Sequence, residues 1–192
     1  MFSKGNNMFQ QKVKTEAEAI KKLLGFIPET LEELRKEMES CVDSQKEEYE
    51  DWDEDLGKYV TRIWQPTIDT TVIDEMLDVF YTSIVGRIYS MAEEGLKVLS
   101  GITGKPKTPK GLPAMSDLDL YYQEIINKYK VTLPSIETLW PDKVKFHLLR
   151  KEITHKGKCH LTEIEKTGLQ ANIESVLKML LFVEEKTRDK RA

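Results

Sequence analysis

All three histidines of the 192-residue chain fall within residues 147–160, which read HLLRKEITHKGKCH. Arg150 and His155 lie in this stretch, and these two residue types together suit phosphodiester chemistry. A guanidinium is a permanent cation whose N–H groups match phosphate oxygens, and an imidazole gives or takes a proton near neutral pH. Such a pair needs no metal ion, so we expect neither a metal nor a cofactor, with Arg150 and His155 as the catalytic candidates.

The residues around this pair are of types that bind phosphate. Residues 143–158 hold six Lys or Arg and one Glu, a net charge of +5, although the whole chain carries −4. An excess of positive charge attracts anions. The candidates for substrate binding are Lys151, Thr154, Lys156 and Lys158.

Each candidate also has an ordinary structural interpretation. Arg150 could be a surface arginine that pairs with a carboxylate such as Glu152. His155 could lie at a helix C-terminus, where a positive charge interacts favourably with the helix dipole and no chemistry is needed. His147 could be a partly buried or interfacial residue. The sequence leaves these alternatives open.

The two cysteines, Cys41 and Cys159, predict free thiols. They lie far apart without a CxxC pair, which favours a reducing compartment and a cytoplasmic location over a disulfide framework. Cys159 and His160 could join His155 as metal ligands, but adjacent ligands without CxxC or HxxxH spacing do not favour zinc. No stretch approaches the roughly 18 apolar residues of a membrane-spanning helix, so we expect no membrane partner.

The elements that must position these residues are predicted to be helices almost throughout. Apolar residues recur at three- and four-residue steps, and no alternating strand pattern lasts more than a few positions. A first helix over 12–26 is expected to be interrupted at Pro28. A long acidic helix follows and could run to Trp64, before Pro66 ends it.

A second strong helix is predicted over 70–100 from a continuous apolar stripe. Residues 101–115 hold three Gly and three Pro and should form a surface loop, of a length that is often functional. Ser116 and Asp119 resemble a capping box that starts a short helix, which should stop near Val131.

The basic segment is predicted to form the next helix, with Pro141 as its first residue and Gly157 as its terminator. Thr162 and Glu165 form a second capping-box pattern, which opens the final amphipathic helix. The short connection between these two helices predicts an antiparallel pair.

The relative direction of the two candidate catalytic side chains is a difficulty on a continuous helix. Arg150 and His155 are five positions apart, which corresponds to a rotation of about 140°. We therefore expect them to face one site only if the helix ends between them or if a second copy of the chain contributes.

The N-terminal part of the chain is strongly acidic. Residues 29–55 hold thirteen Asp or Glu and three Lys or Arg, a net charge of −10. We expect two parts: an N-terminal helical region, 1–66, that packs on a helical bundle formed by 67–192. The acidic region could bind a basic partner, or it could dock on the chain's own basic stretch.

The order of a long helix, a Gly/Pro loop, a short helix, the segment WPDKVKFHLLRKEITHKGK and a closing amphipathic helix resembles the HEPN superfamily. The motif of that family is Arg, four to six residues, then His. Arg150 and His155 fit it with four intervening residues, and the similarity covers residues 70–185. Two positions depart from frequent family patterns: Lys151 follows the Arg where Asn, Asp or His is common, and Gly157 stands where many toxins carry Tyr.

The resemblance implies an all-α, up-and-down bundle of four or five core helices, here with an N-terminal acidic helical extension, that dimerises so that two Arg/His motifs meet. It implies a metal-independent endoribonuclease of a toxin–antitoxin, abortive-infection or other defence system. His155 would act as general acid or base on the 2'-hydroxyl chemistry, and Arg150 would stabilise the phosphorane. RNA, a second copy and an antitoxin or other protein are the implied partners.

Other family members have lost catalysis and serve as nucleotide-binding or interaction modules, so the resemblance leaves open whether the chain is an enzyme. The sequence contains no P-loop, dinucleotide-binding, HExxH or serine-nucleophile motif. It also gives no motif for binding DNA.

Overall fold

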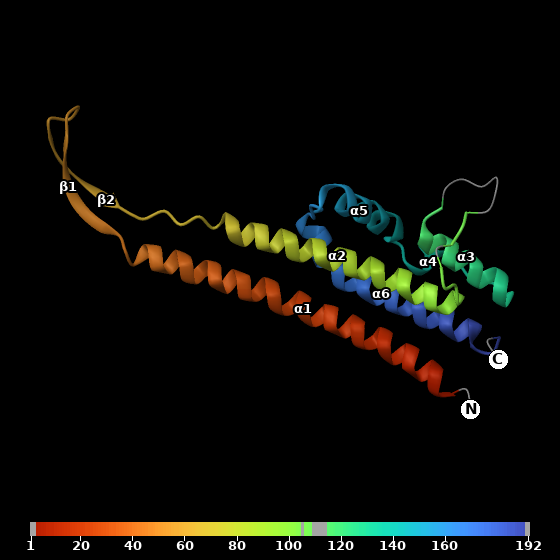
Figure 1. Cartoon of the computed structure of the whole chain (residues 1–192). Helices are drawn as coiled ribbons and strands as arrows, with labels where there is room; N and C mark the ends of the chain where they lie inside the picture. The colour runs from red at the N-terminus through yellow and green to blue at the C-terminus, as the bar shows by residue number, and fades with distance from the viewer. Residues whose placement is uncertain (1–2, 105, 109–114, 191–192) are drawn as a thin grey trace. The chain divides into compact units, whose positions relative to one another are not determined.

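A computed structural model describes residues 3–104, 106–108 and 115–190, and it is mostly helical, as the sequence predicts (Figure 1). Within these residues the elements, in chain order, are α1 (Ser3–Asp43), β1 (Glu47–Asp53), β2 (Lys58–Trp64), α2 (Thr71–Ser100), α3 (Asp117–Tyr129), α4 (Ile136–Leu139), α5 (Lys143–Lys156) and α6 (Glu163–Arg188).

The chain divides into two compact units. The first, here called the core unit, consists of residues 1–24 and 78–192, and the second, the hairpin unit, consists of residues 25–77. These units do not coincide with the segments 1–66 and 67–192, whose status as separate domains stays a prediction.

The core unit is held together by apolar side chains from several helices. Its fully buried residues include Ile88 and Leu96 of α2, Ile125 of α3, and Ile173 and Leu180 of α6. Burial of each such side chain contributes about 1.5–3 kcal/mol, so these contacts supply most of the driving force for folding.

A buried polar network fixes the segment that leads into α5. The indole N–H of Trp140 donates to the side-chain carbonyl of Asn172 at 2.8 Å, and the Asn172 amide donates to the Asp142 carboxylate at 2.8 Å. Because buried polar groups must be hydrogen-bonded, these bonds define the start of α5 relative to α6.

The predicted helix boundaries are mostly confirmed in the core unit. Ser116 accepts a hydrogen bond from the Asp119 N–H at the start of α3, and Thr162 and Glu165 form a full capping box at the start of α6. Gly157 follows α5 with φ 76°, a left-handed conformation that favours glycine. One boundary is wrong: α5 begins at Lys143, after Pro141.

The predicted break at Pro28 is wrong, because α1 continues through this residue. A proline in a helix removes one backbone hydrogen bond and clashes with the preceding turn. In α1 the long helical segments on both sides continue across that local defect.

The prediction that the acidic helix could run to Trp64 is also wrong. α1 ends at Asp43, and β1 and β2 form an antiparallel hairpin in which Glu47 pairs with Trp64 and Asp53 with Lys58. Aromatic and β-branched residues favour strands, and the turn is defined by Gly57 at φ 57° and by the Asp53 carboxylate. The abundance of charged residues obscured the two-residue alternation.

The expected surface loop 101–115 lies partly outside the described residues. α2 ends at Ser100, and Gly101 follows with φ 71°. The expectation for residues 105 and 109–114 falls on positions that the structure does not describe.

Candidate functional site

The groove beside α5 brings together most of the residues that the sequence singles out. It has a volume of about 380 Å³. One wall is formed by α5, with His147, Arg150, Lys151, Thr154 and His155. The opposite wall is formed by α2 and the segment that enters α3, with Tyr89, Glu93, Met115, Ser116 and Asp117.

The α5 residues of this wall follow a helical stripe. Their positions, 147, 150, 151, 154 and 155, correspond to i, i+3, i+4, i+7 and i+8, so they share one face of the helix. Arg150 and His155 occupy the two edges of that stripe, about 140° apart. Both residues border the same groove, although α5 continues through Lys156. Neither a helix end between them nor a second copy of the chain is needed to bring them to one groove.

Arg150 is held by the opposite wall of the groove. Its guanidinium lies 3.9 Å from the Glu93 carboxylate and 5.3 Å from the centre of the Tyr89 ring. Glu152, the partner considered from sequence, instead pairs with Lys156 at 3.2 Å. Arg150 is thus oriented across the groove, and part of its charge is balanced there.

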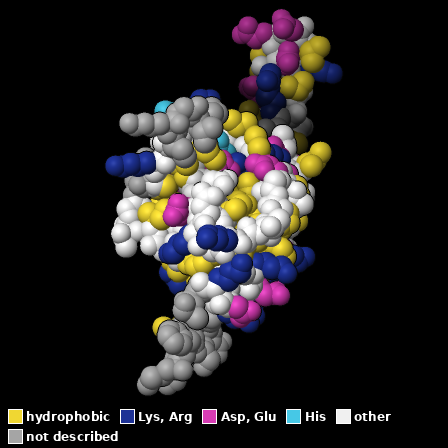
Figure 2. Space-filling view, turned by 90° about the vertical axis from the view of Figure 1, so that its right-hand side faces the viewer, with side chains coloured by type: hydrophobic (Ala, Val, Ile, Leu, Met, Phe, Trp, Pro, Cys, Tyr) yellow, Lys and Arg dark blue, Asp and Glu magenta, His cyan; other side chains and the backbone are white. Residues whose placement is uncertain are grey.

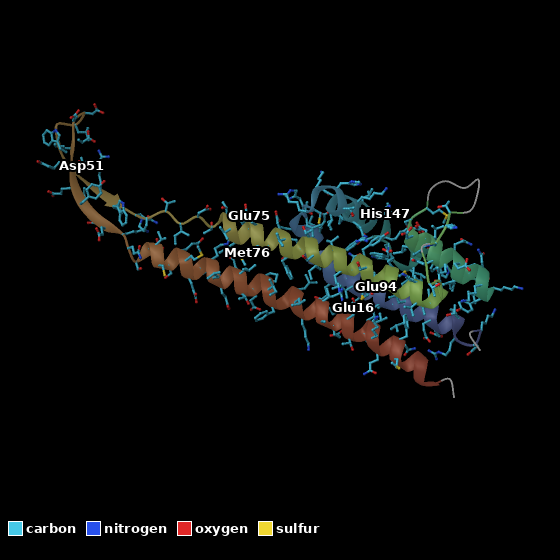
Figure 3. All side chains as sticks on the ribbon, viewed as in Figure 1. Glu16, Asp51, Glu75, Met76, Glu94 and His147 are labelled. Carbon is cyan, nitrogen blue, oxygen red and sulfur yellow. The ribbon has the colours of Figure 1, made fainter. Side chains whose placement is uncertain are left out.

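Tyr89 and His147 form a second polar pair in the groove. The Tyr89 hydroxyl lies 3.0 Å from His147 Nδ1. Burial raises the pKa of Tyr89 to about 12. Burial, followed by the nearby positive charge of Lys151, lowers the pKa of His147. Both side chains are therefore neutral near pH 7, and the phenol can donate to the imidazole (Figure 3 labels His147).

His155 is exposed and lies in the last turn of α5, while Gly157 is the cap residue. Within the described part of the chain, no hydrogen bond or ion pair is formed by its side chain. An exposed imidazole at the edge of a groove is available to a bound molecule. The structure therefore leaves the His155 side chain accessible at the edge of the groove.

The four candidates for substrate binding separate into two groups. Lys151 and Thr154 line the groove, and the Thr154 hydroxyl donates to the backbone carbonyl of Arg150 at 2.9 Å. Lys156 and Lys158 are exposed but do not line it. The groove thus includes two of the four residues.

Tyr89 and Glu93 are groove residues that sequence reasoning missed, because the helix that carries them reads as core. A signal was present: these two polar residues are four positions apart within an otherwise apolar stripe, so they share one face of α2. Glu93 and Asp117 give the groove a mixed charge instead of the uniformly positive one that the α5 sequence suggests.

The residues considered as metal ligands have separate surroundings. Cys159 is buried, its N–H donates to the Thr82 hydroxyl at 3.2 Å, and burial raises the pKa of its thiol. His160 lies 3.5 Å from the Asp78 carboxylate. Among the residues that the structure describes, no three His, Cys, Asp or Glu side chains are grouped as metal ligands would be.

Comparisons with protein-family models, with curated proteins and with solved structures found no match to this chain. None of the described helices contains an apolar stretch that could cross a membrane. The class of protein therefore rests on its own structure: a mostly helical chain with Arg, Lys and His side chains along one wall of a groove.

Proposed function

We propose that this protein is a metal-independent endoribonuclease of the HEPN type, acting in a toxin–antitoxin or other defence system. The supporting observation is that Arg150 and His155 border one groove, together with Lys151 and Thr154. Cleavage of an RNA phosphodiester needs a cation that binds phosphate oxygens and a group that transfers protons. The Arg150 guanidinium and the His155 imidazole are groups of these two kinds.

The proposed reaction is attack of a ribose 2'-oxygen on the adjacent phosphorus, with cleavage of the bond from phosphorus to the 5'-oxygen. His155, whose imidazole is exposed at the edge of the groove, either accepts the proton of the 2'-hydroxyl or donates a proton to the departing 5'-oxygen, and water exchanges the other proton. The products are a 2',3'-cyclic phosphate and a 5'-hydroxyl. The need for the 2'-hydroxyl selects RNA over DNA.

Arg150 is proposed to stabilise the extra negative charge on the phosphorus oxygens. Its ion pair with Glu93 is long, at 3.9 Å, and its side chain is partly exposed. A phosphate offers a shorter, bidentate partner, so substrate can displace that weak contact. Lys151 and Thr154 would contact neighbouring phosphates from the same helix face. A homodimer and an antitoxin or other protein partner belong to this proposal.

The test is cleavage of a mixed cellular RNA pool by the purified full chain in EDTA. Wild type should leave cyclic phosphate ends, and His155→Ala and Arg150→Ala should each lower the rate by about 10²-fold or more. His160→Ala is the matched control, because it removes an exposed histidine outside the groove, and it should retain the wild-type rate. Equal rates for all four proteins would refute the assignment.

A second candidate function is a non-catalytic module that binds nucleotides or another protein. It is favoured by the contacts of Arg150 with Glu93 and Tyr89, which are those of an arginine with a structural role. The same experiment separates the two functions. RNA or nucleotide binding by a folded protein that cleaves nothing would favour this second candidate.

A further inference from the structure

The hairpin of β1 and β2 presents two faces, and each carries two exposed aromatic residues: Trp52 and Tyr59 on one, Tyr49 and Trp64 on the other. Side chains directly opposite each other in an antiparallel pair lie on the same face, and successive residues alternate between faces. The register therefore defines one face, here called the aromatic face, which consists of Glu48, Glu50, Trp52, Tyr59, Thr61 and Ile63.

The apolar residues of the aromatic face are left exposed by the described chain. The exposed fractions of Trp52, Tyr59 and Ile63 are 50%, 67% and 62%. The rings of Trp52 and Tyr59 contact each other edge to face, with centroids 5.2 Å apart. Large side chains that stay this exposed on a short sheet are typical of a surface that binds a partner.

Within the described part of the chain, two of the three carboxylates of the opposite face are ion-paired, with Glu47 as the exception, whereas neither carboxylate of the aromatic face is. On the opposite face, Asp51 and Asp53 are paired with Arg62 at 3.0 Å and 3.5 Å (Asp51 is labelled in Figure 3). For Glu48 and Glu50, the described residues supply no ion pair. The aromatic face therefore combines exposed rings with negative charge that no cation of the described chain balances.

The charge of the hairpin restricts the chemistry of a partner. Residues 47–64 contain seven Asp or Glu and two Lys or Arg, a net charge of −5, and Figure 2 shows acidic side chains next to hydrophobic ones in this part of the molecule. Nucleic acid and acidic protein surfaces are repelled by such a surface. Two copies of β1 would also repel each other if they paired edge to edge, as charged edge strands do.

The small size of the sheet supports the presence of a partner. An isolated two-stranded hairpin is marginally stable in water, and its strands leave backbone hydrogen-bonding groups unpaired at both edges. No residue of 47–64 is buried. A partner that covers the aromatic face would add the apolar burial that the hairpin lacks.

We propose that the aromatic face of the hairpin binds an extended, arginine- and lysine-rich segment of another protein. A guanidinium stacks well on the faces of tryptophan and tyrosine rings and binds a carboxylate with two parallel hydrogen bonds. Trp52 with Tyr59 supplies the first kind of contact, and Glu48 with Glu50 supplies the second. This inference does not depend on RNA cleavage at the groove.

The test uses the full chain and a fluorescein-labelled peptide of about ten alternating Arg and Val residues, long enough to span one strand. Fluorescence anisotropy at about 150 mM salt measures the Kd. Wild type should bind this peptide at least about tenfold more tightly than a Glu/Val peptide of the same length. Equal affinity for the two peptides would overturn the proposal.

The face is tested with two double variants of equal charge change. Glu48→Gln/Glu50→Gln removes both carboxylates of the aromatic face and should weaken peptide binding about tenfold or more. The control is Glu47→Gln/Glu54→Gln, which changes the opposite face and the turn and should stay within about twofold of wild type. Equal losses in both would show a diffuse charge effect and contradict a binding face.

The aromatic contribution is tested with Trp52→Ala, which should weaken binding about tenfold, with Trp64→Ala on the opposite face as its control. Retention of wild-type affinity by Trp52→Ala would contradict the proposed stacking.

Sedimentation equilibrium of the protein alone tests whether a second copy of the chain binds the aromatic face instead. If the protein self-associates and Glu48→Gln/Glu50→Gln abolishes this, the face binds a second copy and the proposal is overturned.

Discussion

At the scale of single residues, His147 is the titratable group whose surroundings in the groove are best defined. Burial and the positive charge of Lys151 lower its pKa. Replacing Lys151 by Gln removes a charge that opposes protonation, so the pKa of His147 should rise towards its ordinary value. NMR titration of the imidazole C–H signals measures this shift directly.

Lys158→Gln is the control for this titration, because it removes an exposed lysine that does not line the groove. It should leave the pKa of His147 unchanged, and an equal response in both variants would contradict a local effect. The lowered pKa of His147 also predicts how the folding stability depends on pH. A lowered pKa means that the unfolded state binds the proton more readily, so stability falls as the pH drops from about 6.5 towards the pKa in the fold.

The sequence predicted Arg150 and His155 as site residues from their types and spacing, which are local properties, and both line one groove. Lys151 and Thr154 are found for the same reason, since all four lie on one helix. Glu93 and Tyr89 could not be assigned from sequence, because their proximity to Arg150 depends on how α2 packs beside α5. Contacts between helices far apart in the chain have no signature in local periodicity.

At the scale of the elements, the close approach of α2 and α6 depends on Gly95. A Cβ atom at this position would lie 2.6 Å from both methyl carbons of Leu180, which is fully buried. Gly95→Ala should therefore destabilise the protein by about 1–3 kcal/mol, although alanine favours helices. Urea unfolding followed by circular dichroism measures the change.

Gly86→Ala provides a control in the same helix. A Cβ at Gly86 meets no atom within 4 Å, so alanine should stabilise α2 by up to about 1 kcal/mol. The two glycines thus predict effects of opposite sign from the same substitution. Stabilisation by both would show that Leu180 moves aside at little cost.

The helix ends could be predicted because caps depend on a few neighbouring residues. Ser116, Thr162 and Gly157 each act where their residue types indicate. The continuation of α1 through Pro28 and the hairpin at 47–64 could not be derived in the same way. The first depends on the whole length of the helix, and the second on pairing between two strands that each read as charged.

At the scale of the whole molecule, the residues that make the core and those that make the hairpin have different physical roles. The apolar cluster contains residues of all six described helices, α1 to α6, whereas 47–64 contributes no buried residue. Stability of the core unit should thus depend on its own helices. The sequence indicated an acidic region with a separate role but assigned it to a helix.

Deletion of the hairpin tests this separation. Replacing residues 47–64 with Asn-Gly joins Lys46 to Gln65, a connection that the pairing of Glu47 with Trp64 makes feasible. The thermal midpoint of helix unfolding should stay within about 2 °C of wild type, because none of the deleted residues is buried or belongs to the apolar cluster. Circular dichroism measures it, and binding of the Arg/Val peptide should disappear in the same protein.

Ile125→Ala is the reference variant for this measurement, because it shows how far the thermal midpoint falls when a core side chain is lost. It removes a fully buried side chain of α3 and should cost about 2–5 kcal/mol, which lowers the midpoint by many degrees. If the deletion lowered the midpoint as much as Ile125→Ala does, the hairpin would be part of the stabilising structure. A binding role alone would then not account for its exposed aromatic residues.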